Sequence, residues 1–399
     1  MPLHFRRTLA NPNRLFTRTA LAQCRLIPYL SALTLRNVMS ARQHLQLNDD
    51  FAMQGGMLNR PTLAYETWGE LNTLGDNAIL LFTGLSPSAH AASSPMDPSA
   101  GWWEDMIGRD KPIDTHRYFV ICVNSLGSCF GSTGPASVNP ATGTLYRLDF
   151  PVLTVEDIAN SAIAVLDHLG VQKVNTVIGA SMGGMTALSF ALMHPSRCRR
   201  LVSISSGSRS QPYAIALRSL QREIIRTDPL WQQGRYPVDQ HGPVDGMRLA
   251  RKLGMISYRS AEEWQARFGR ERSSDSPDTD NLFGINFEVE SYLQNHAERF
   301  IGAFDANCYL YLSRAMDLFD AADHGGSLAA SFAHLSLEAA LVVGVKSDAL
   351  FPLHQQVELA EAMQPFVPDT RMCALDSIQG HDSFLVDMDR FRPTIADFF

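Results

Sequence analysis

A serine between two glycines is the residue of this chain best suited to do chemistry. The run Gly179-Ala180-Ser181-Met182-Gly183 is a Gly-x-Ser-x-Gly pattern that follows an apolar run and precedes apolar residues at helical spacing. This order predicts a strand, a tight turn and a helix, in which the glycines make room for a strained serine with an exposed hydroxyl. We interpret Ser181 as a nucleophile. An ordinary Gly-rich turn is the alternative, and isolated matches to so short a pattern are common.

A serine hydroxyl is a weak nucleophile, so it needs a histidine base and a carboxylate that holds this histidine in the right tautomer. In enzymes with this turn the acid and the base come later in the chain, each in a loop after a strand. Asp348 follows an apolar run at 339–345, and His381 follows another at 370–375. His354 is the rival base, whereas His194 precedes a proline at the end of the helix after Ser181.

Acyl transfer also needs backbone N–H groups that stabilise the oxyanion of the transition state. One such group comes from the residue after the nucleophile, here Met182, and the other from a loop that follows an earlier strand. The loop 83–86 follows the apolar run 78–82, and we expect its contribution to come from Leu85.

Arg218 and Arg222 are spaced four residues apart, and Arg226 follows one turn later. Arginines at this spacing often form a solvated helix face. Placed over a nucleophile, they would instead form guanidinium forks that bind substrate carboxylates. The pattern alone leaves both interpretations open.

Strands that alternate with helices must position these residues. Apolar runs predict buried strands at 78–82, 118–123, 174–178, 201–205, 339–345 and 370–375, and an alternating run predicts a half-buried antiparallel edge strand at 62–68. Helical spacing covers 154–169, with Thr154 and Asp157 as a capping pair, and also 353–363 and 383–398. The alternation predicts a mostly parallel sheet flanked by helices. Together with the turn at Ser181, this arrangement resembles the α/β-hydrolase fold.

The alternation stops at about residue 210 and resumes at about 335. Candidate helices lie at 213–226, 246–253, 261–268 and 287–300, and the charged stretch 270–281 is expected to be a mobile loop. We interpret this insertion as a helical lid over the active face.

Composition excludes several classes of protein. The chain has 399 residues, 45% of them apolar, and a net charge of −7, so it can bury a large core and has no basic footprint for nucleic acid. No apolar run reaches the roughly 18 residues of a membrane span. Six scattered cysteines without a Cys-x-x-Cys pair indicate free thiols in a reducing cytoplasm and argue against zinc or another metal. Cys129, in a Gly-rich loop, could be reactive, although a structural role is commoner.

Residues 1–48 differ from the remainder, which we treat as one domain at 49–399. They contain seven arginines and no lysine, aspartate or glutamate. Such a composition is typical of mitochondrial presequences. A disordered basic tail, or a translated segment upstream of a true start at Met39 or Met53, would look the same.

Several ordered motifs give the chain a family resemblance from about residue 60 to its end. They are Gly101-Trp-Trp-Glu104, Gly127-Ser-Cys-Phe-Gly-Ser-Thr-Gly-Pro135, Asp149-Phe-Pro151, Gly179 to Met185, Gln221-Arg222, Asp228-Pro229 and Gly380-His-Asp382. Together they resemble the homoserine O-acetyltransferase family, whose members have an α/β-hydrolase core with a helical lid.

The resemblance implies a ping-pong acyltransferase that uses acyl-CoA as a co-substrate, needs no cofactor and forms a homodimer through its lid helices. It implies Ser181 as the nucleophile, Asp348 as the acid and His381 as the base. By the same resemblance Arg222 would bind the carboxylate of an amino-acid acceptor and Asp382 its ammonium group.

Two departures from the acetyltransferase pattern resemble the L-serine O-succinyltransferase branch, which serves cysteine biosynthesis. The family's run Thr-Gly-Asp-Ser-His is replaced by a loop with Leu85, Ser86, Pro87 and Ser88, and a usually neutral position is Arg218. A remodelled loop can shrink the acceptor site from homoserine to serine, and Arg218 can pair the distal carboxylate of a succinyl group. Homoserine as acceptor and acetyl-CoA as donor are the near alternatives. An esterase or a non-catalytic ligand-binding relative is the more distant one.

Overall fold

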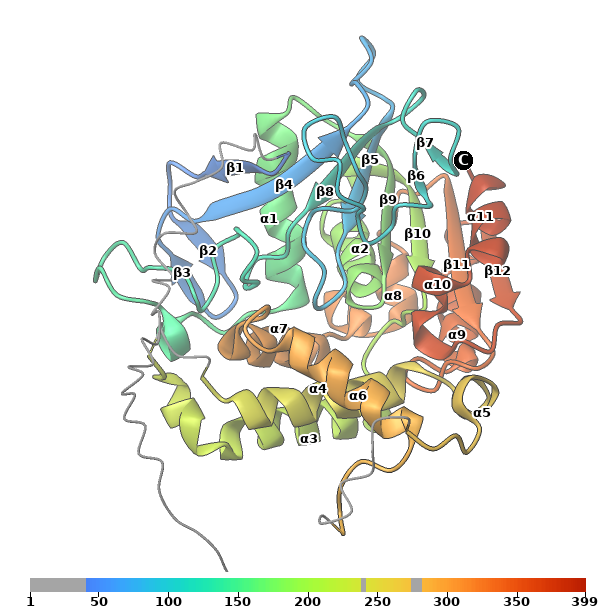
Figure 1. The fold of residues 1–399 in the computed structure, drawn as a ribbon. Coiled ribbons are helices and arrows are strands. Elements are labelled where there is room, and N and C mark those ends of the chain that lie inside the picture. The colour runs from blue at the N-terminus through green and yellow to red at the C-terminus, as the bar shows by residue number, and fades with distance from the viewer. Residues whose placement is uncertain (1–40, 238–241, 274–281) are drawn as a thin grey trace, which may run out of the picture. The chain divides into compact units, whose positions relative to one another are not determined.

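The computed structural model describes residues 41–237, 242–273 and 282–399. Their centre is an eight-stranded sheet with the order β1-β4-β8-β5-β9-β10-β11-β12 (Figure 1). Its strands are β1 (Gln43–Gln46), β4 (Thr62–Trp68), β5 (Ala78–Phe82), β8 (Phe119–Val123), β9 (Val174–Ala180), β10 (Cys198–Ile204), β11 (Ala339–Val345) and β12 (Thr370–Leu375). Two small sheets pair β2 (Phe51–Met53) with β3 (Gly56–Leu58), and β6 (Ile107–Gly108) with β7 (Ile113–Asp114).

The sheet is mostly parallel, as the alternation of strands and helices predicts. From β8 to β12 every neighbouring pair is parallel, whereas β4 runs antiparallel to both β1 and β8. The expected edge position of β4 is wrong, because β1 pairs with its outer side and four of its seven residues in succession are buried. The sheet therefore already includes Gln43, and the boundary expected at residue 49 is too late. Residues 1–40 of the expected basic extension lie outside the described residues.

Helices pack on both faces of the sheet. Helices α1 (Val155–His168), α2 (Met182–Met193) and α9 (Leu353–Met363) contribute to one apolar core. On the opposite face α10 (Ser383–Val386) and α11 (Met388–Ala396) contribute to a second core. The expected capping pair of α1 is present, because Thr154 Oγ1 accepts from Asp157 N at 3.2 Å and Asp157 Oδ2 accepts from Thr154 N at 2.9 Å. The single helix expected at 383–398 is wrong, since the chain breaks it at Asp387.

The insertion between β10 and β11 is helical, as expected. It contains α3 (Pro212–Thr227), α4 (Val244–Tyr258), α5 (Ala261–Phe268), α6 (Glu288–Phe300), α7 (Ala306–Leu318) and α8 (Leu328–Phe332). Helices α3 and α4 pack together, and α7 packs on α3 (Figure 1). Helix α7 escaped sequence analysis because most of its residues are buried, so it lacks a clear polar face. Most of the charged stretch at 270–281 lies outside the described residues.

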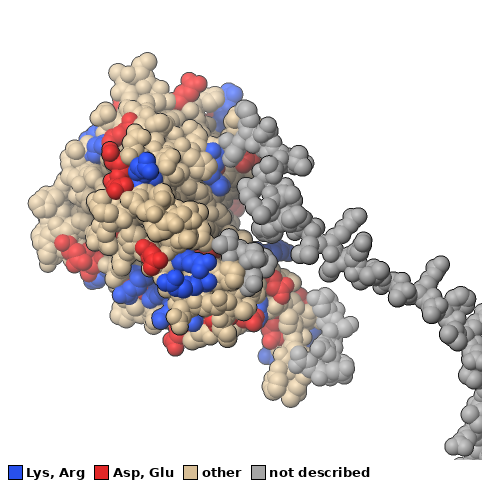
Figure 2. All heavy atoms as spheres, turned by 90° about the vertical axis from the view of Figure 1, so that its left-hand side faces the viewer, with Lys and Arg blue, Asp and Glu red and all other residues tan. Residues whose placement is uncertain are grey.

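Short 3-10 turns connect several of these elements. They are η1 (Arg147–Asp149), η2 (Pro195–Arg197), η3 (Pro229–Gly234), η4 (Ala321–His324) and η5 (Gly380–Asp382). Within the described ranges, no helix is both long and apolar enough to cross a membrane. On the face shown in Figure 2, basic and acidic side chains lie interspersed among neutral ones, and neither sign forms a continuous surface.

Candidate active site

The turn between β9 and α2 holds Ser181 in a strained conformation. Ser181 has φ +57°, a region that residues other than glycine rarely adopt. The two glycines explain how the chain can turn there. A Cβ on Gly179 would lie 2.0 Å from the Gly183 oxygen, and a Cβ on Gly183 would lie 2.4 Å from the Phe82 oxygen. The turn is therefore so tight that only hydrogen fits on either side of the serine.

The structure brings Ser181, His381 and Asp348 into one hydrogen-bonded chain. His381 Nε2 lies 2.9 Å from Ser181 Oγ, and His381 Nδ1 lies 2.8 Å from Asp348 Oδ2. Backbone N–H groups of Leu350 and Phe351 donate to the other oxygen, Oδ1, at 2.9 Å each. This arrangement fixes the carboxylate and directs the Nε2 lone pair at the serine hydroxyl.

His381 is adapted to accept a proton. Burial disfavours its charged form, but the charge of Asp348 and the hydrogen bond to it outweigh burial, so the pKa of His381 is raised above its ordinary value. The ring stacks on Phe351, with centroids 5.3 Å apart. The rival His354 is exposed and contacts Gln211, and His194 caps the end of α2. Neither reaches the serine.

A pocket with about 760 Å³ of empty space, part of it open to solvent, lies beside this chain of residues. The loop after β5 contributes Leu85, Ser86 and Pro87 to its wall, and the lid contributes Arg218 and Tyr258. The remaining lining residues are Gly84, Trp102, Ala180, Ser181, Gln221, Ser257, Tyr309, Met316, Leu350, His381, Asp382, Phe384 and Leu385. Ser181 and His381 thus belong to the polar part of a largely apolar pocket, the usual form of a small-molecule site.

The two predicted arginines have different positions. Arg218 lines the pocket, whereas Arg222 is not among the lining residues. Both bind the buried carboxylate of Asp317 from α7, with Arg218 Nε at 2.6 Å from Oδ1 and Arg222 Nη2 at 2.6 Å from Oδ2. Arg222 Nη1 also donates to Ser313 Oγ at 2.9 Å. In this structure Asp317 and Ser313 hold the guanidinium of Arg222, and its expected contact with the acceptor's carboxylate stays a prediction.

Arg218 keeps one donor for a ligand. Its side chain is 5% exposed, and Nη2 donates to Ser210 Oγ at 2.6 Å. Its third nitrogen, Nη1, is buried and has no hydrogen-bond partner within the described part of the chain. A buried guanidinium nitrogen without a partner is costly, so a ligand oxygen at this place would be stabilising.

Residues 77–387 match the family described as the alpha/beta hydrolase fold. The chain belongs to this family. Its relatives include the "Serine O-succinyltransferase" of Litchfieldella anticariensis, which is 57% identical over 90% of this chain and 98% of that protein. The protein of the same name from Stenotrophomonas maltophilia strain K279a is 54% identical over 86% of this chain and 93% of its own.

Solved structures of this α/β-hydrolase family superpose well. The homoserine O-acetyltransferase from Bacillus anthracis has a TM-score of 0.82, with 27% identity over 90% of this chain and 96% of its own. Esterase E22 has a TM-score of 0.81, with 28% identity over 90% of this chain and 99% of its own. The fold is therefore shared by a transferase and an esterase.

The backbone donors expected for the oxyanion are the N–H groups of Met182 and Leu85. Met182 is the first residue of α2, and the first N–H groups of an α-helix have no partner within the helix. Leu85 lines the pocket next to Gly84. Both positions stay predictions, since an oxyanion would have to be bound to test them.

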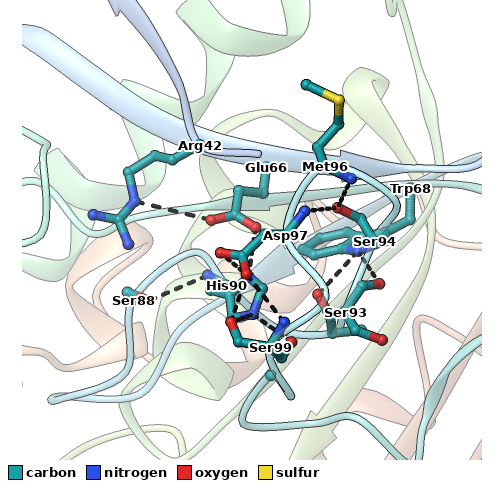
Figure 3. A network of polar contacts seen from close by, with 12 residues as sticks. Arg42, Glu66, Trp68, Ser88, His90, Ser93, Ser94, Met96, Asp97 and Ser99 are labelled. Atoms are coloured by element: carbon teal, nitrogen blue, oxygen red, sulfur yellow. Dashed lines mark hydrogen bonds and ion pairs between the residues drawn. The ribbon is translucent and has the colours of Figure 1, made fainter. Parts of the chain in front are cut away.

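Ion pairs anchor the end of the loop that carries Leu85 (Figure 3). His90 Nδ1 lies 2.8 Å from Oε2 of the buried Glu66, and its Nε2 lies 3.0 Å from the Ser99 oxygen. Burial opposes the charge on His90, but its contacts with Glu66 and Ser99 prevail and raise its pKa. Ser88 does not line the pocket; its hydroxyl accepts from His90 N, and its carbonyl accepts from the Trp102 indole at 2.9 Å. Ser88 therefore shapes the loop, whereas Ser86 and Pro87 form the wall.

Sequence analysis missed several residues of this site. Tyr258 and Tyr309 line the pocket, and Asp317 binds both arginines, but none of them stands in a distinctive sequence pattern. Trp102 belongs to the Gly-Trp-Trp-Glu motif of the family resemblance, to which the sequence assigned no function. The five described cysteines, Cys122, Cys129, Cys198, Cys308 and Cys373, are free thiols, and the described residues contain no cluster of metal-ligating side chains.

Proposed function

We infer that this chain is a serine O-succinyltransferase, which moves a succinyl group from succinyl-CoA to the hydroxyl of L-serine. The relatives named above carry this function in their names at 54% identity or more and match nearly the full chain. The product, O-succinyl-L-serine, would serve cysteine biosynthesis. The structural observation that best supports this function is the complete hydrogen-bonded chain of Ser181, His381 and Asp348. It lies beside a pocket lined by the buried guanidinium of Arg218.

The geometry supports a two-step transfer. His381 Nε2 takes the proton of Ser181 Oγ, which attacks the thioester carbon, and the oxyanion is stabilised by the N–H groups of Met182 and Leu85. The C–S bond breaks, and His381 returns the proton to the leaving CoA thiolate. The hydroxyl of L-serine then gives its proton to His381 and attacks the Ser181 ester. Collapse of the second tetrahedral intermediate releases O-succinyl-L-serine and returns the proton to Ser181.

Arg218 supports succinyl as the acyl group. A succinyl chain on Ser181 ends in a carboxylate that acetyl lacks. Arg218 lines the same pocket, and its buried Nη1 has no partner among the described residues. Arg222 would act behind it, through their shared partner Asp317, instead of binding the acceptor directly. Asp382 lines the pocket next to the base and can bind the acceptor's ammonium group.

A crossed product assay tests this function. Serine and homoserine are each incubated with succinyl-CoA and with acetyl-CoA, and the products are identified by mass spectrometry. We expect O-succinyl-L-serine to form fastest. A faster homoserine or acetyl reaction would move the assignment to the near alternatives, the reaction named for the Bacillus anthracis structure among them.

The similarity to esterase E22 makes hydrolysis the second candidate. Pre-formed acyl-enzyme should lose its succinyl group slowly to water, as succinate, and faster when L-serine is added, as O-succinyl-L-serine. Equal release with and without L-serine would favour an esterase.

A homodimer in the cytoplasm is the proposed setting of this reaction. On α3, Tyr213 and Leu220 are 56% and 47% exposed, and on the adjacent α4, Leu249 and Ile256 are 46% and 49% exposed. Each pair is seven residues apart, two turns of one helix face, and such apolar side chains suit a second copy of the chain. Sedimentation of the purified protein at micromolar concentration would give the oligomeric state.

A further inference from the structure

A turn of the lid packs directly on the loop that carries the base. Between α4 and α5, Arg259 Nη1 donates to Gln379 Oε1 at 2.9 Å, and the hydroxyl of Ser260 donates to the Ile378 oxygen. Gly380 has φ +70°, and a Cβ there would lie 2.7 Å from the Tyr258 oxygen. Lid and base loop therefore meet without room for a side chain at this point.

Within this contact, Arg259 lies between two carboxylates. Its Nε is 3.3 Å from Asp382 Oδ2, and its Nη1 is 3.7 Å from Glu263 Oε1. Asp382 lines the catalytic pocket, whereas Arg259, Glu263 and Gln379 line a neighbouring hollow. Arg259 thus approaches Asp382 from outside the pocket, and its contact with Oδ2 leaves Oδ1 available as an acceptor.

We propose that Arg259 is a positioning residue for the acceptor: it keeps Asp382 ionised and oriented, so that Asp382 can bind the ammonium group of an amino acid. The inference rests on the proposed function, in which Asp382 is the ammonium ligand. Arg259 touches neither substrate nor reacting atoms. Its role is to set the charge of a carboxylate that does.

The electrostatics of the pocket explain why Asp382 needs such a partner. Burial disfavours its charged form and raises its pKa, and Asp348 adds to this effect. The positive charge of Arg259 is the strongest opposing influence, followed by His381 and Arg251. Tyr258, which packs on the same loop, is itself held neutral because burial raises its pKa. A neutral Asp382 would bind an ammonium group poorly, since the attraction between opposite charges would be lost.

The test compares two arginine variants that lose the same charge. Arg259→Gln removes the partner of Asp382. Arg267→Gln removes the other arginine that binds Glu263. The Nη1 of Arg267 lies 3.5 Å from Glu263 Oε1, and Arg267 has no described contact with Asp382. Steady-state rates are measured against L-serine concentration over a range of pH. The burst of CoA released on mixing with succinyl-CoA alone reports the acylation step, which precedes acceptor binding.

For Arg259→Gln we expect the KM for L-serine to rise about tenfold, the effect of one pKa unit of lost interaction. The acid limb of kcat/KM for L-serine should move to higher pH by about one unit, because Asp382 then protonates more easily. The CoA burst should keep its rate. Arg267→Gln should leave all three quantities unchanged.

Further variants separate this inference from the proposed function. If Asp382→Asn does not raise the KM for L-serine, Asp382 is not the ammonium ligand and that part of the proposed function is wrong. If Asp382→Asn raises the KM but Arg259→Gln does not, the role of Arg259 is overturned. Arg259→Lys keeps the charge and should retain the native acid limb even if the Gln variant folds poorly. A Lys variant whose acid limb matches that of Arg259→Gln would also refute the proposal.

Discussion

Replacing Arg218 by methionine should change the choice of acyl group while it spares acyl transfer itself. Methionine keeps much of the apolar stem but removes the guanidinium whose Nη1 is without a partner among the described residues. A charge-assisted hydrogen bond contributes roughly 1.5–3 kcal/mol. Since each 1.36 kcal/mol is tenfold in rate, kcat/KM for succinyl-CoA should fall by about 10–150-fold. Acetyl-CoA has no distal carboxylate, so its kcat/KM should change little.

The assay measures CoA release with both donors at saturating L-serine, and the decisive quantity is the succinyl-to-acetyl ratio of kcat/KM. Arg226→Met is the matched control, because Arg226 lies on the same helix but is exposed. Arg218→Met leaves Asp317 paired with Arg222 only, so unfolding in urea is recorded as well. An unchanged ratio in a folded variant would show that Arg218 does not select the acyl group.

Three further predictions concern the catalytic turn and its supports. His381 must be neutral to act as a base, and its pKa is raised. As the pH is lowered, kcat/KM for succinyl-CoA should therefore begin to fall at a pH above the ordinary pKa of a histidine. Asp348→Asn should move this decline to lower pH and reduce kcat by about 10⁴-fold. Gly183→Ala should destabilise the fold by about 1–3 kcal/mol in urea, because its Cβ would lie 2.4 Å from a backbone oxygen of β5. His90→Asn should cost about 3 kcal/mol in urea by leaving buried Glu66 without its nearest cation, and Glu66→Gln should restore part of this loss.

The parts of the site that the sequence predicted are those with local causes. The strained turn at Ser181 depends on two glycines within five residues, and the strands before Asp348 and His381 contain apolar runs. Order along the chain then suffices, because parallel strands bring their carboxyl ends to one edge of the sheet. Because their causes are local as well, the bounds of β5, β11 and β12 were predicted to the residue.

The parts that were missed depend on contacts between distant segments. The helix that carries Arg218 and Arg222 was predicted within two residues, but not which arginine reaches the pocket. That outcome depends on Asp317, which lies roughly a hundred residues later on α7. Most residues of α7 are buried, so its sequence lacks the apolar and polar alternation that marks a helix. Likewise, β4 was predicted as an edge strand because its partner β1 lies near the end of the arginine-rich segment 1–48. Composition favoured a tail there, and tertiary pairing prevailed.

The shared carboxylate gives the arginine pair a function that neither arginine has alone. Two guanidinium groups on one buried carboxylate carry a net single positive charge, which matches the single charge of a succinyl carboxylate. Without Asp317 two buried cations would repel each other. Without Arg222, Asp317 would neutralise Arg218 and cancel its attraction for an anion. Arg222 thus contributes to succinyl binding by satisfying Asp317, which leaves Arg218 with the net charge and a free nitrogen. Arg222→Met should therefore lower kcat/KM for succinyl-CoA more than kcat/KM for acetyl-CoA, although Arg222 does not line the pocket.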